Sequence, residues 1–197
     1  MPEIRLHLAS EVTPLWRATE ETLARNGLPP PFWAFAWAGG QALARYLLDR
    51  PALVAGRAVL DLGSGSGLVA IAAAMAGAGP VTAAEIDPFA IAAITANAAL
   101  NGVEIALVAD DLLDAPAPHP EVVTAGDVCY EAPMAERLIP WLRAQAAAGA
   151  LVLLGDPGRA YLPKTGLVAC ATYPVSTSRE IETGDVLETS VWRVLPG

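Results

Sequence analysis

The sequence predicts an α/β domain in which a mostly parallel sheet carries helices on both faces. Short apolar runs alternate along the chain with helical stretches. Several of these runs are apolar on both faces, which is typical of parallel strands buried between two helix layers. From Leu167 onward the pattern changes, because two strand-like segments follow each other without a helix between them. We therefore expect a seven-stranded sheet that ends in an antiparallel pair of strands.

Apolar residues recur either with the period of a strand or with that of a helix, and the points where one pattern gives way to the other predict the bounds of each element. Gly and Pro mark the breaks, as at Asn26-Gly27, in the Pro-rich turn over residues 27–35 and at Pro51. Residues 3–9 alternate apolar and polar side chains and could add a short strand. The other predicted strands are residues 58–62, 81–85, 104–110, 121–127, 150–156, 167–175 and 186–194. The predicted helices are residues 13–26, a stretch from Gly40 to Pro51, and residues 67–77, 88–100 and 132–147.

Length and composition suit one compact domain. The chain has 197 residues, of which 54% are hydrophobic, enough for a sizeable single core. We expect one domain over residues 1–197. It would comprise an N-terminal helical and aromatic cap at residues 1–50, a ligand-binding core at 57–156 and the strand pair at 157–197.

Charge and residue usage narrow the classes of function. The formal net charge is −9 and no Lys/Arg cluster is present, which argues against a nucleic-acid partner. The N-terminus has no apolar segment of the signal-peptide type, and apolar runs break before the length of about 20 residues that a membrane span needs. Cys129, Cys170, His7 and His119 lack metal-ligand spacing, so no metal site is expected. These features, with the Ala-rich composition, predict a cytoplasmic bacterial protein with reduced thiols.

A glycine-rich turn follows the predicted strand at residues 58–62. Gly63, Gly65 and Gly67 allow a sharp turn and let backbone N–H groups approach a ligand beside a helix N-terminus. A dinucleotide fingerprint has the spacing G-x-G-x-x-G, but Leu68 stands at its third glycine position. The G-x-G-x-G loop resembles motif I of the Rossmann-like S-adenosylmethionine-dependent methyltransferases. A dinucleotide-dependent oxidoreductase is the alternative from a different class.

Acidic side chains follow the next two predicted strands. Glu85 lies about 20 residues beyond the glycines, where an acid is expected to bind a ribose diol. Asp87 precedes Pro88 and is better explained as a helix N-cap. Asp110 and Asp111 end the third strand, and either could bind the adenine amino group or cap a turn.

The stretch "VVTAGDVCYEAP" ends the fourth predicted strand of the core in polar residues. Asp127 and Tyr130 form a D-x-x-Y pattern there, which resembles the seven-β-strand protein lysine methyltransferases. Cys129 is expected to face the core, and Glu131 to begin the next helix. The alternative is a loop acid and a packed tyrosine.

A narrower resemblance spans residues 3–192. The segments "PFWAFAWAGGQALARYLL", "VLDLGSGSGLVAIAAAMAGA", "EIDPFAIAAITANAALN", "AGDVCYE", "LLGDPGR" and "ETSVW" are together similar to the lysine methyltransferases of the electron transfer flavoprotein β subunit. The mitochondrial members carry a targeting extension that is missing here, so the resemblance points to the bacterial branch.

This resemblance implies S-adenosylmethionine as the cofactor, no metal, and a Lys-rich segment of the flavoprotein β subunit as the partner. Asp127 would orient the lysine amine for in-line methyl transfer, with Tyr130 as the second contact. The implied cofactor-binding residues are Asp61, Gly63, Ser64, Gly65, Gly67, Glu85, Ile86, Asp110, Asp111, Leu112, Trp37, Gly39, Gly40 and Gly126. The implied substrate-binding residues are Trp33, Glu131 and Arg159, while Phe35 is expected to pack in the core.

Some alternatives stay open at this stage. The acceptor could be another protein, such as a ribosomal one, or a small amine or ring nitrogen, and the chain could also be a non-catalytic binding protein. Asp156 is expected to cap the turn in "GDPGR", where Arg159 either projects toward the substrate or forms a salt bridge that holds the loop. Residues 176–185 are expected to form a hairpin or a rim that contacts a protein substrate.

Overall fold

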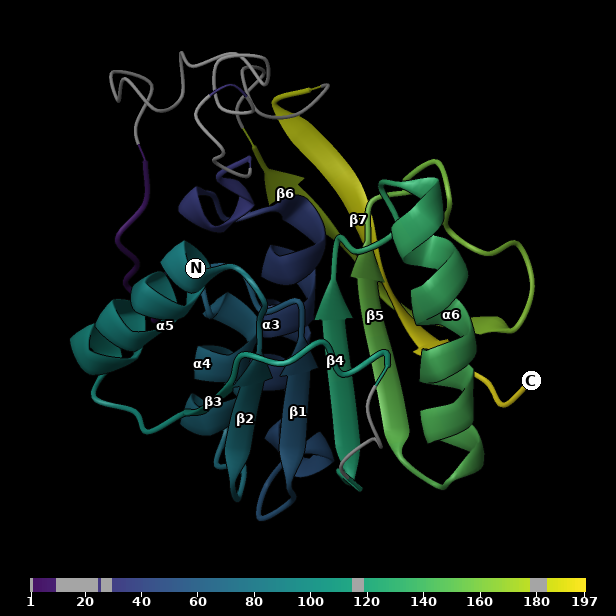
Figure 1. Cartoon of the computed structure of the whole chain (residues 1–197), viewed down its shortest axis with the longest axis horizontal. Helices are drawn as coiled ribbons and strands as arrows, with labels where there is room; N and C mark the ends of the chain where they lie inside the picture. The colour runs from purple at the N-terminus through teal and green to yellow at the C-terminus, as the bar shows by residue number, and fades with distance from the viewer. Residues whose placement is uncertain (1, 10–24, 26–29, 115–118, 178–183) are drawn as a thin grey trace.

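A single seven-stranded sheet forms the centre of the molecule. The computed structural model describes residues 2–9, 25, 30–114, 119–177 and 184–197. The strands are β1 (Val59–Leu62), β2 (Val81–Ala84), β3 (Ala106–Val108), β4 (Val122–Gly126), β5 (Leu151–Asp156), β6 (Leu167–Ser176) and β7 (Val186–Val194). Their order in the sheet is β3-β2-β1-β4-β5-β7-β6, with β3 at one edge and the β6–β7 pair at the other (Figure 1). Strands β1 to β5 pair in parallel, and β7 runs antiparallel to both β5 and β6.

Helices lie on both faces of this sheet, which confirms the predicted fold class. The helical elements are the 3₁₀ turns η1 (Phe32–Ala34) and η2 (Pro51–Leu53) and the helices α3 (Ala38–Asp49), α4 (Leu68–Met75), α5 (Pro88–Asn101) and α6 (Ala132–Ala147). Residues from α3, α4 and α5 pack with Val59, Val81 and Val122 on one face. Residues from α6 pack with Leu60 and Val123 on the other. The alternation of neighbouring strand residues between two apolar clusters explains why the strands are apolar on both faces.

Most predicted boundaries agree with the structure to within a few residues, but one predicted strand is wrong. Residues 4–9 form no strand. The backbone N–H groups of Arg5 and His7 instead donate to the side-chain oxygens of Asn101 and Asn97 on α5. Because helix side chains satisfy these donors and Ile4 is buried against α3 and α4, the alternating pattern forms an extended segment without a sheet neighbour. The predicted helix at 13–26 and most of the predicted rim at 176–185 lie outside the described residues, apart from Arg25, which is helical, and the ends of the rim.

Helix α3 approaches the carboxyl ends of β4 and β5 unusually closely, and glycines make this possible. A Cβ on Gly39 would overlap the carbonyl oxygen of Gly155 and would lie 2.5 Å from Oδ2 of Asp127. A Cβ on Gly126 would lie 2.9 Å from the Cα of Gly40. Gly39 and Gly126 therefore allow the backbone of α3 to contact the backbones of β4 and β5.

We predict opposite effects for alanine at the two neighbouring glycines of α3. Gly39→Ala should lower the free energy of unfolding by about 2 kcal/mol or more, because its Cβ would collide with backbone atoms that cannot move independently. Gly40→Ala is the matched control, since its Cβ would meet only Val69 and Leu68 side-chain carbons at 3.9 and 4.0 Å. Alanine in a helix is favoured over glycine by about 0.5–1 kcal/mol, so this variant should be neutral or stabilised. Urea unfolding of both variants measures the difference, and equal destabilisation would contradict the packing argument.

Candidate active site

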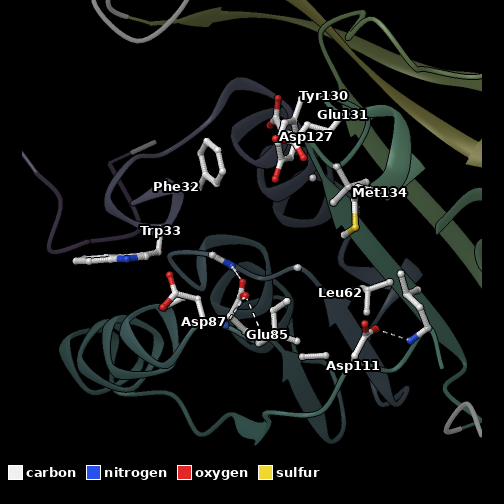
Figure 2. Close-up of a pocket in the computed structure, with 18 of the residues that line it drawn as sticks. Phe32, Trp33, Leu62, Glu85, Asp87, Asp111, Asp127, Tyr130, Glu131 and Met134 are labelled. Atoms are coloured by element: carbon white, nitrogen blue, oxygen red, sulfur yellow. Dashed lines mark hydrogen bonds between the residues drawn. The ribbon is translucent and has the colours of Figure 1, made fainter. Parts of the chain in front are cut away.

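A cavity of about 470 Å³ opens at the carboxyl ends of β1, β2 and β4. Its volume is within the range of about 300–1,000 Å³ that is typical of small-molecule sites, and its place beside the switch in strand order is where α/β sheets bind ligands. Figure 2 shows Phe32 and Trp33 on the side of the cavity opposite Asp111 and Met134.

The cavity brings together most of the predicted site residues. Those that line it are Trp33, Trp37, Gly63, Gly65, Glu85, Ile86, Asp110, Asp111, Leu112, Gly126, Asp127, Tyr130, Glu131 and Arg159. Five residues that were expected to bind the cofactor do not line it, namely Asp61, Ser64, Gly67, Gly39 and Gly40.

Asp61 and Ser64 lie beneath the glycine loop instead of facing the cavity. The Asp61 carboxylate is 1% exposed and accepts hydrogen bonds from the hydroxyls of Ser64, at 2.6 Å, and Thr124, at 2.8 Å. Burial raises the pKa of Asp61 to about 6, although these hydrogen bonds oppose the rise. Asp61 and Ser64, which were expected to bind the cofactor, therefore lie outside the cavity wall, and their side chains tie the loop to β1 and β4.

Three other glycines also serve the scaffold rather than the cavity wall. Gly67 has φ +83° and forms the N-cap of α4, where a Cβ would lie 3.2 Å from Ile94 on α5. Gly39 faces the backbone of Gly155 on β5, and the Cα of Gly40 lies beside Gly126 on β4. They act on the cavity indirectly, by placing the N-terminus of α3 beside it.

The Glu85 carboxylate links the end of β2 to the glycine loop. It accepts hydrogen bonds from the backbone N–H of Gly65, at 2.9 Å, and from those of Ile86 and Asp87. Asp87 caps α5, since its Oδ1 accepts from the N–H of Phe89 at 2.8 Å, which confirms the predicted N-cap. The acid expected to bind a ribose therefore stands in the cavity wall and holds the loop in place.

Asp110 and Asp111 differ in their contacts, and this difference separates their roles. Oδ2 of Asp111 accepts a hydrogen bond from Arg137 at 2.8 Å, and Oδ1 accepts one from the N–H of Leu113. The Arg137 guanidinium lowers the pKa of Asp111. Asp110 lines the cavity, is exposed, and has no hydrogen bond or ion pair with any residue that the structure describes. Of these two carboxylates, only that of Asp110 is uncommitted and faces a ligand in the cavity.

Asp127 is buried at the end of β4 and is bound by two neighbouring elements. Its Oδ1 accepts from Arg159 Nη2 at 2.7 Å and from Nε at 3.1 Å, and its Oδ2 accepts from the N–H of Gly40 at 2.9 Å. Asp127 has φ +57°, a left-handed conformation that Asp tolerates better than most side chains do. Burial raises its pKa to about 6, against the effect of the Arg159 guanidinium.

Aromatic side chains form the wall beside Asp127. The rings of Phe32 and Tyr130 lie 5.1 Å apart, and Trp37 packs edge-on against Phe32 at 6.1 Å. Tyr130 is 40% exposed, and burial of part of its ring raises the pKa of its hydroxyl, which stays protonated at neutral pH. Phe35 is buried and Cys129 is fully buried, as predicted.

Sequence reasoning missed some residues of the cavity wall. Phe32, Met134 and Arg137 line the cavity without having been assigned to it. Phe32 lies next to Trp33 in the aromatic segment before α3, so the assignment of Trp33 to the site could have been extended to Phe32. Met134 and Arg137 lie on α6, and nothing in their local pattern indicates which face of that helix meets a ligand.

Metal binding and membrane insertion find no support in the described parts of the chain. No group of three or more His, Cys, Asp or Glu side chains among them is arranged to hold a metal ion. None of the helices in the described ranges has the length and apolar character to cross a bilayer.

The cavity fits a nucleoside carrying a charged side chain. Gly63 and Gly65 leave the loop backbone bare at the cavity wall, and Glu85 and Asp110 supply acceptors for hydroxyl and amino groups. Ile86, 67% exposed, and Leu112 add apolar surface beside them. This combination of acceptors, bare backbone and apolar surface matches S-adenosylmethionine.

Comparison with known proteins agrees with this fit. Residues 42–128 match the family model "Ribosomal protein L11 methyltransferase (PrmA)". A crystal structure of ribosomal protein L11 methylase from Lactobacillus delbrueckii subsp. bulgaricus superposes with a TM-score of 0.60 at 25% identity, over 83% of this chain and 81% of that one. Magnesium protoporphyrin IX methyltransferase from Synechocystis PCC 6803, solved with bound S-adenosylmethionine, shares the fold with a TM-score of 0.58 at 17% identity, over 80% of this chain and 78% of that one.

The fold, the glycine loop and the acids behind it define a Rossmann-like S-adenosylmethionine-dependent methyltransferase. A longer match then gives the particular family. The electron transfer flavoprotein beta subunit lysine methyltransferase of Xenopus laevis is 39% identical over 201 residues, which cover 99% of this chain and 80% of that protein. The chain belongs to the electron transfer flavoprotein beta subunit lysine methyltransferase family, and the oxidoreductase alternative is set aside.

The buried Asp61 should make stability depend on pH in a defined direction. Its folded pKa of about 6 lies above the ordinary value, so its contribution to stability is present below about pH 4 and is lost as the pH rises through 6. Relative to wild type, Asp61→Asn should therefore gain about 2 kcal/mol in free energy of unfolding between pH 4 and 7. Urea unfolding across this range measures the difference. Ser64→Ala, which keeps the carboxyl but removes a hydrogen bond that lowers its pKa, should extend the window to higher pH. Parallel curves of unfolding free energy against pH for wild type and Asp61→Asn would refute the raised pKa of Asp61.

Proposed function

We propose that this protein transfers methyl groups from S-adenosylmethionine to lysine side chains of the electron transfer flavoprotein β subunit. The observation that carries the proposal is family membership over nearly the whole chain, including the Asp127 and Tyr130 segment. The acidic character of the site supports it, since six acids but only two arginines line the cavity, and the chain has a net charge of −9. Complementary potential would draw a Lys-rich segment toward this mouth.

The cofactor is assigned to the cavity wall formed by the loop after β1 and the ends of β2 and β3. Glu85 would accept the ribose hydroxyls. A carboxylate has about four acceptor positions, and Glu85 already accepts three backbone N–H groups. Binding both hydroxyls therefore requires one of these contacts to open, and the contact with Gly65 is the one that crosses between elements.

Asp110 is proposed to bind the adenine amino group, because the carboxylate of Asp111 already accepts hydrogen bonds from Arg137 and from the N–H of Leu113. Ile86 and Leu112 would contact the adenine ring, and Trp37 and Gly126 would lie near the other end of the cofactor. Trp33 and Glu131 are proposed to contact the protein substrate at the mouth of the cavity.

Bound S-adenosylmethionine supplies a methyl group on a positively charged sulfur that is open to attack by a neutral amine. The residues of this chain have to bring the lysine amine to that point in its neutral form, although free lysine has a pKa of about 10.4. Asp127 and Tyr130 are proposed to orient the amine: the carboxylate accepts its N–H groups, and the Tyr130 hydroxyl fixes its direction. The released proton would pass to water. Alignment of this kind can contribute about 7–11 kcal/mol to a barrier.

The protein is proposed to act in the cytoplasm of a bacterium and not on nucleic acid. The Ala-rich composition and the shortage of basic clusters support this. A ribosomal protein is the second candidate acceptor, because the matched family model and the structure at 25% identity are both L11 methyltransferases.

A labelling experiment tests the proposed substrate. Purified protein, tritiated S-adenosylmethionine and the purified electron transfer flavoprotein should give a labelled β subunit, with each methylated lysine located by mass spectrometry. Ribosomal protein L11 and a mixture of small amines serve as competing acceptors in parallel reactions. Label confined to L11 or to small molecules would overturn the proposal, as would tight binding of NAD without binding of S-adenosylhomocysteine.

The assignment of Asp110 predicts an ordered set of affinities for S-adenosylhomocysteine. Asp110→Ala should raise Kd about tenfold or more, the range expected for loss of a hydrogen bond to a charged group. Asp111→Ala should raise Kd less than about threefold, because its carboxylate already serves Arg137 and Leu113. Glu104→Gln, which removes an exposed acid outside the cavity, is the matched control. Isothermal calorimetry gives all three values, and the reverse order for the two aspartates would contradict the assignment.

A further inference from the structure

Arg159 was expected either to touch the substrate or to hold its loop, and its contacts indicate a different task. The guanidinium reaches from the turn after β5 to the end of β4, where two of its nitrogens lie 2.7 and 3.1 Å from one oxygen of Asp127. Only 21% of the Arg159 side chain is exposed, and 9% of that of Asp127. Solvent and salt screen an ion pair shielded to this degree much less than one on an open surface.

The backbone around Arg159 is built to hold its side chain in place. Oδ1 of Asp156 accepts hydrogen bonds from the N–H groups of Gly158, at 2.6 Å, and Arg159, at 2.7 Å, which confirms the predicted cap of this turn. Gly158 has φ +98°, so the turn needs a glycine there. Cζ of the Arg159 guanidinium lies 5.7 Å from the centroid of the Trp37 ring, within the range of a cation–π contact.

The same pair also fixes the start of helix α3. The helix has no side-chain cap of its own at Trp37, and Oδ2 of Asp127 accepts the N–H of Gly40 in its place. A carboxylate at a helix N-terminus is stabilised by the helix dipole and by the free N–H groups. Asp127 is thus held on both oxygens, by Arg159 on one and by α3 on the other (Figure 2 shows its position beside Tyr130).

Charge explains why this arrangement matters for an amine. Burial raises the pKa of Asp127 to about 6, and the negative charge of Asp156 adds to the rise. The Arg159 guanidinium and the N–H of Gly40 oppose it, and Arg159 has the larger effect. Without Arg159 the carboxyl would take up a proton near neutral pH, and a neutral acid attracts an ammonium group far less than a carboxylate does.

We propose that Arg159 is a positioning residue that keeps the Asp127 carboxylate ionised and oriented toward the target lysine, and that it acts on methyl transfer only through Asp127. This inference rests on the proposed function and replaces the expectation that Arg159 contacts the substrate. Arg159 fills both acceptor positions of Oδ1, and Gly40 fills one on Oδ2. About one acceptor position therefore remains for the incoming amine.

A double-mutant cycle tests the dependence of one residue on the other. Arg159→Gln should lower kcat/KM for the flavoprotein β subunit about tenfold or more, and Asp127→Asn should lower it further. The double variant should be no slower than Asp127→Asn alone, because the carboxylate through which Arg159 is proposed to act has then lost its charge. Losses that multiply in the double variant would overturn the inference, since Arg159 would then act independently.

Two further variants guard against a merely structural explanation. Arg159→Lys keeps a positive charge but only one point of contact, so it should recover part of the activity lost in Arg159→Gln. Arg45→Gln is the matched control, because it breaks ion pairs with Glu3 and Asp49 on the exposed side of α3 and should leave kcat/KM within about twofold of wild type. Affinity for S-adenosylhomocysteine should stay within about threefold of wild type in every variant. Loss of that affinity in Arg159→Gln with no recovery in Arg159→Lys would overturn the inference in favour of a scaffold role.

Stability against pH gives a readout that needs no methyl acceptor. Because Arg159 lowers the pKa of Asp127, the free energy of unfolding of Arg159→Gln should keep falling as the pH rises beyond 6, where the contribution of Asp127 in wild type is already lost. Adding Asp127→Asn should abolish that extra slope, and parallel curves for the single and double variants would contradict the proposal.

If wild-type protein methylates no flavoprotein, the proposed function fails while these curves still test the ion pair. If methylation is intact but the losses multiply, only the role of Arg159 fails.

Discussion

The N-terminus of helix α3 lies against the carboxyl ends of β4 and β5, and the rest of the site depends on this contact. Backbone meets backbone there, because Gly39 and Gly126 carry no Cβ that would separate the helix from the strands. The closeness lets a carboxylate from β4 accept an N–H of the helix, which in turn fixes Asp127 in a left-handed conformation. Any side chain at Gly39 would move the helix, the capping contact and the cavity wall together.

Two buried carboxylates divide the work of supporting and forming the site. Asp61 is buried under the glycine loop, where the hydroxyls of Ser64 and Thr124 donate to its carboxyl group, so it shapes the loop without facing a ligand. Asp127 lies at the cavity wall and is balanced by a guanidinium and a helix N-terminus. Burial raises the pKa of both carboxyls to about 6, but the partners differ in kind: hydroxyls around one, a full positive charge beside the other. The difference suits one carboxyl to scaffolding and the other to binding a cation.

The two sides of the cavity differ in chemical character. Toward β2 and β3 the wall offers bare backbone, two acids and apolar side chains, which suit a nucleoside. Toward β4 and β5 it offers Asp127, Tyr130 and the aromatic rings of the segment before α3, which suit a protonatable amine approaching from outside. The glycine loop and Gly126 lie between them, so a methyl donor and a lysine would meet where the chain has the least side-chain bulk. This division explains why the aromatic segment before α3 and the turn after β5 belong to the same site although about 120 residues separate Phe35 from Asp156.

Periodicity and glycine spacing determined the fold class, the places of the strands and the acids at their carboxyl ends, because these depend on local backbone preferences and on which faces are buried. The helix at residues 132–147 and the cap at Asp87 follow from such local rules. Three outcomes needed the tertiary structure. Residues 3–9 alternate like a strand, yet α5 supplies their hydrogen-bond partners. Asp110 and Asp111 are neighbours of the same residue type, and the ion pair with Arg137 from α6 commits only the second of them. Arg159 and Asp127 are 32 residues apart, and their pairing depends on two strand ends meeting at one edge of the sheet. Contacts between distant segments depend on how packed elements are placed in space, which no local pattern encodes.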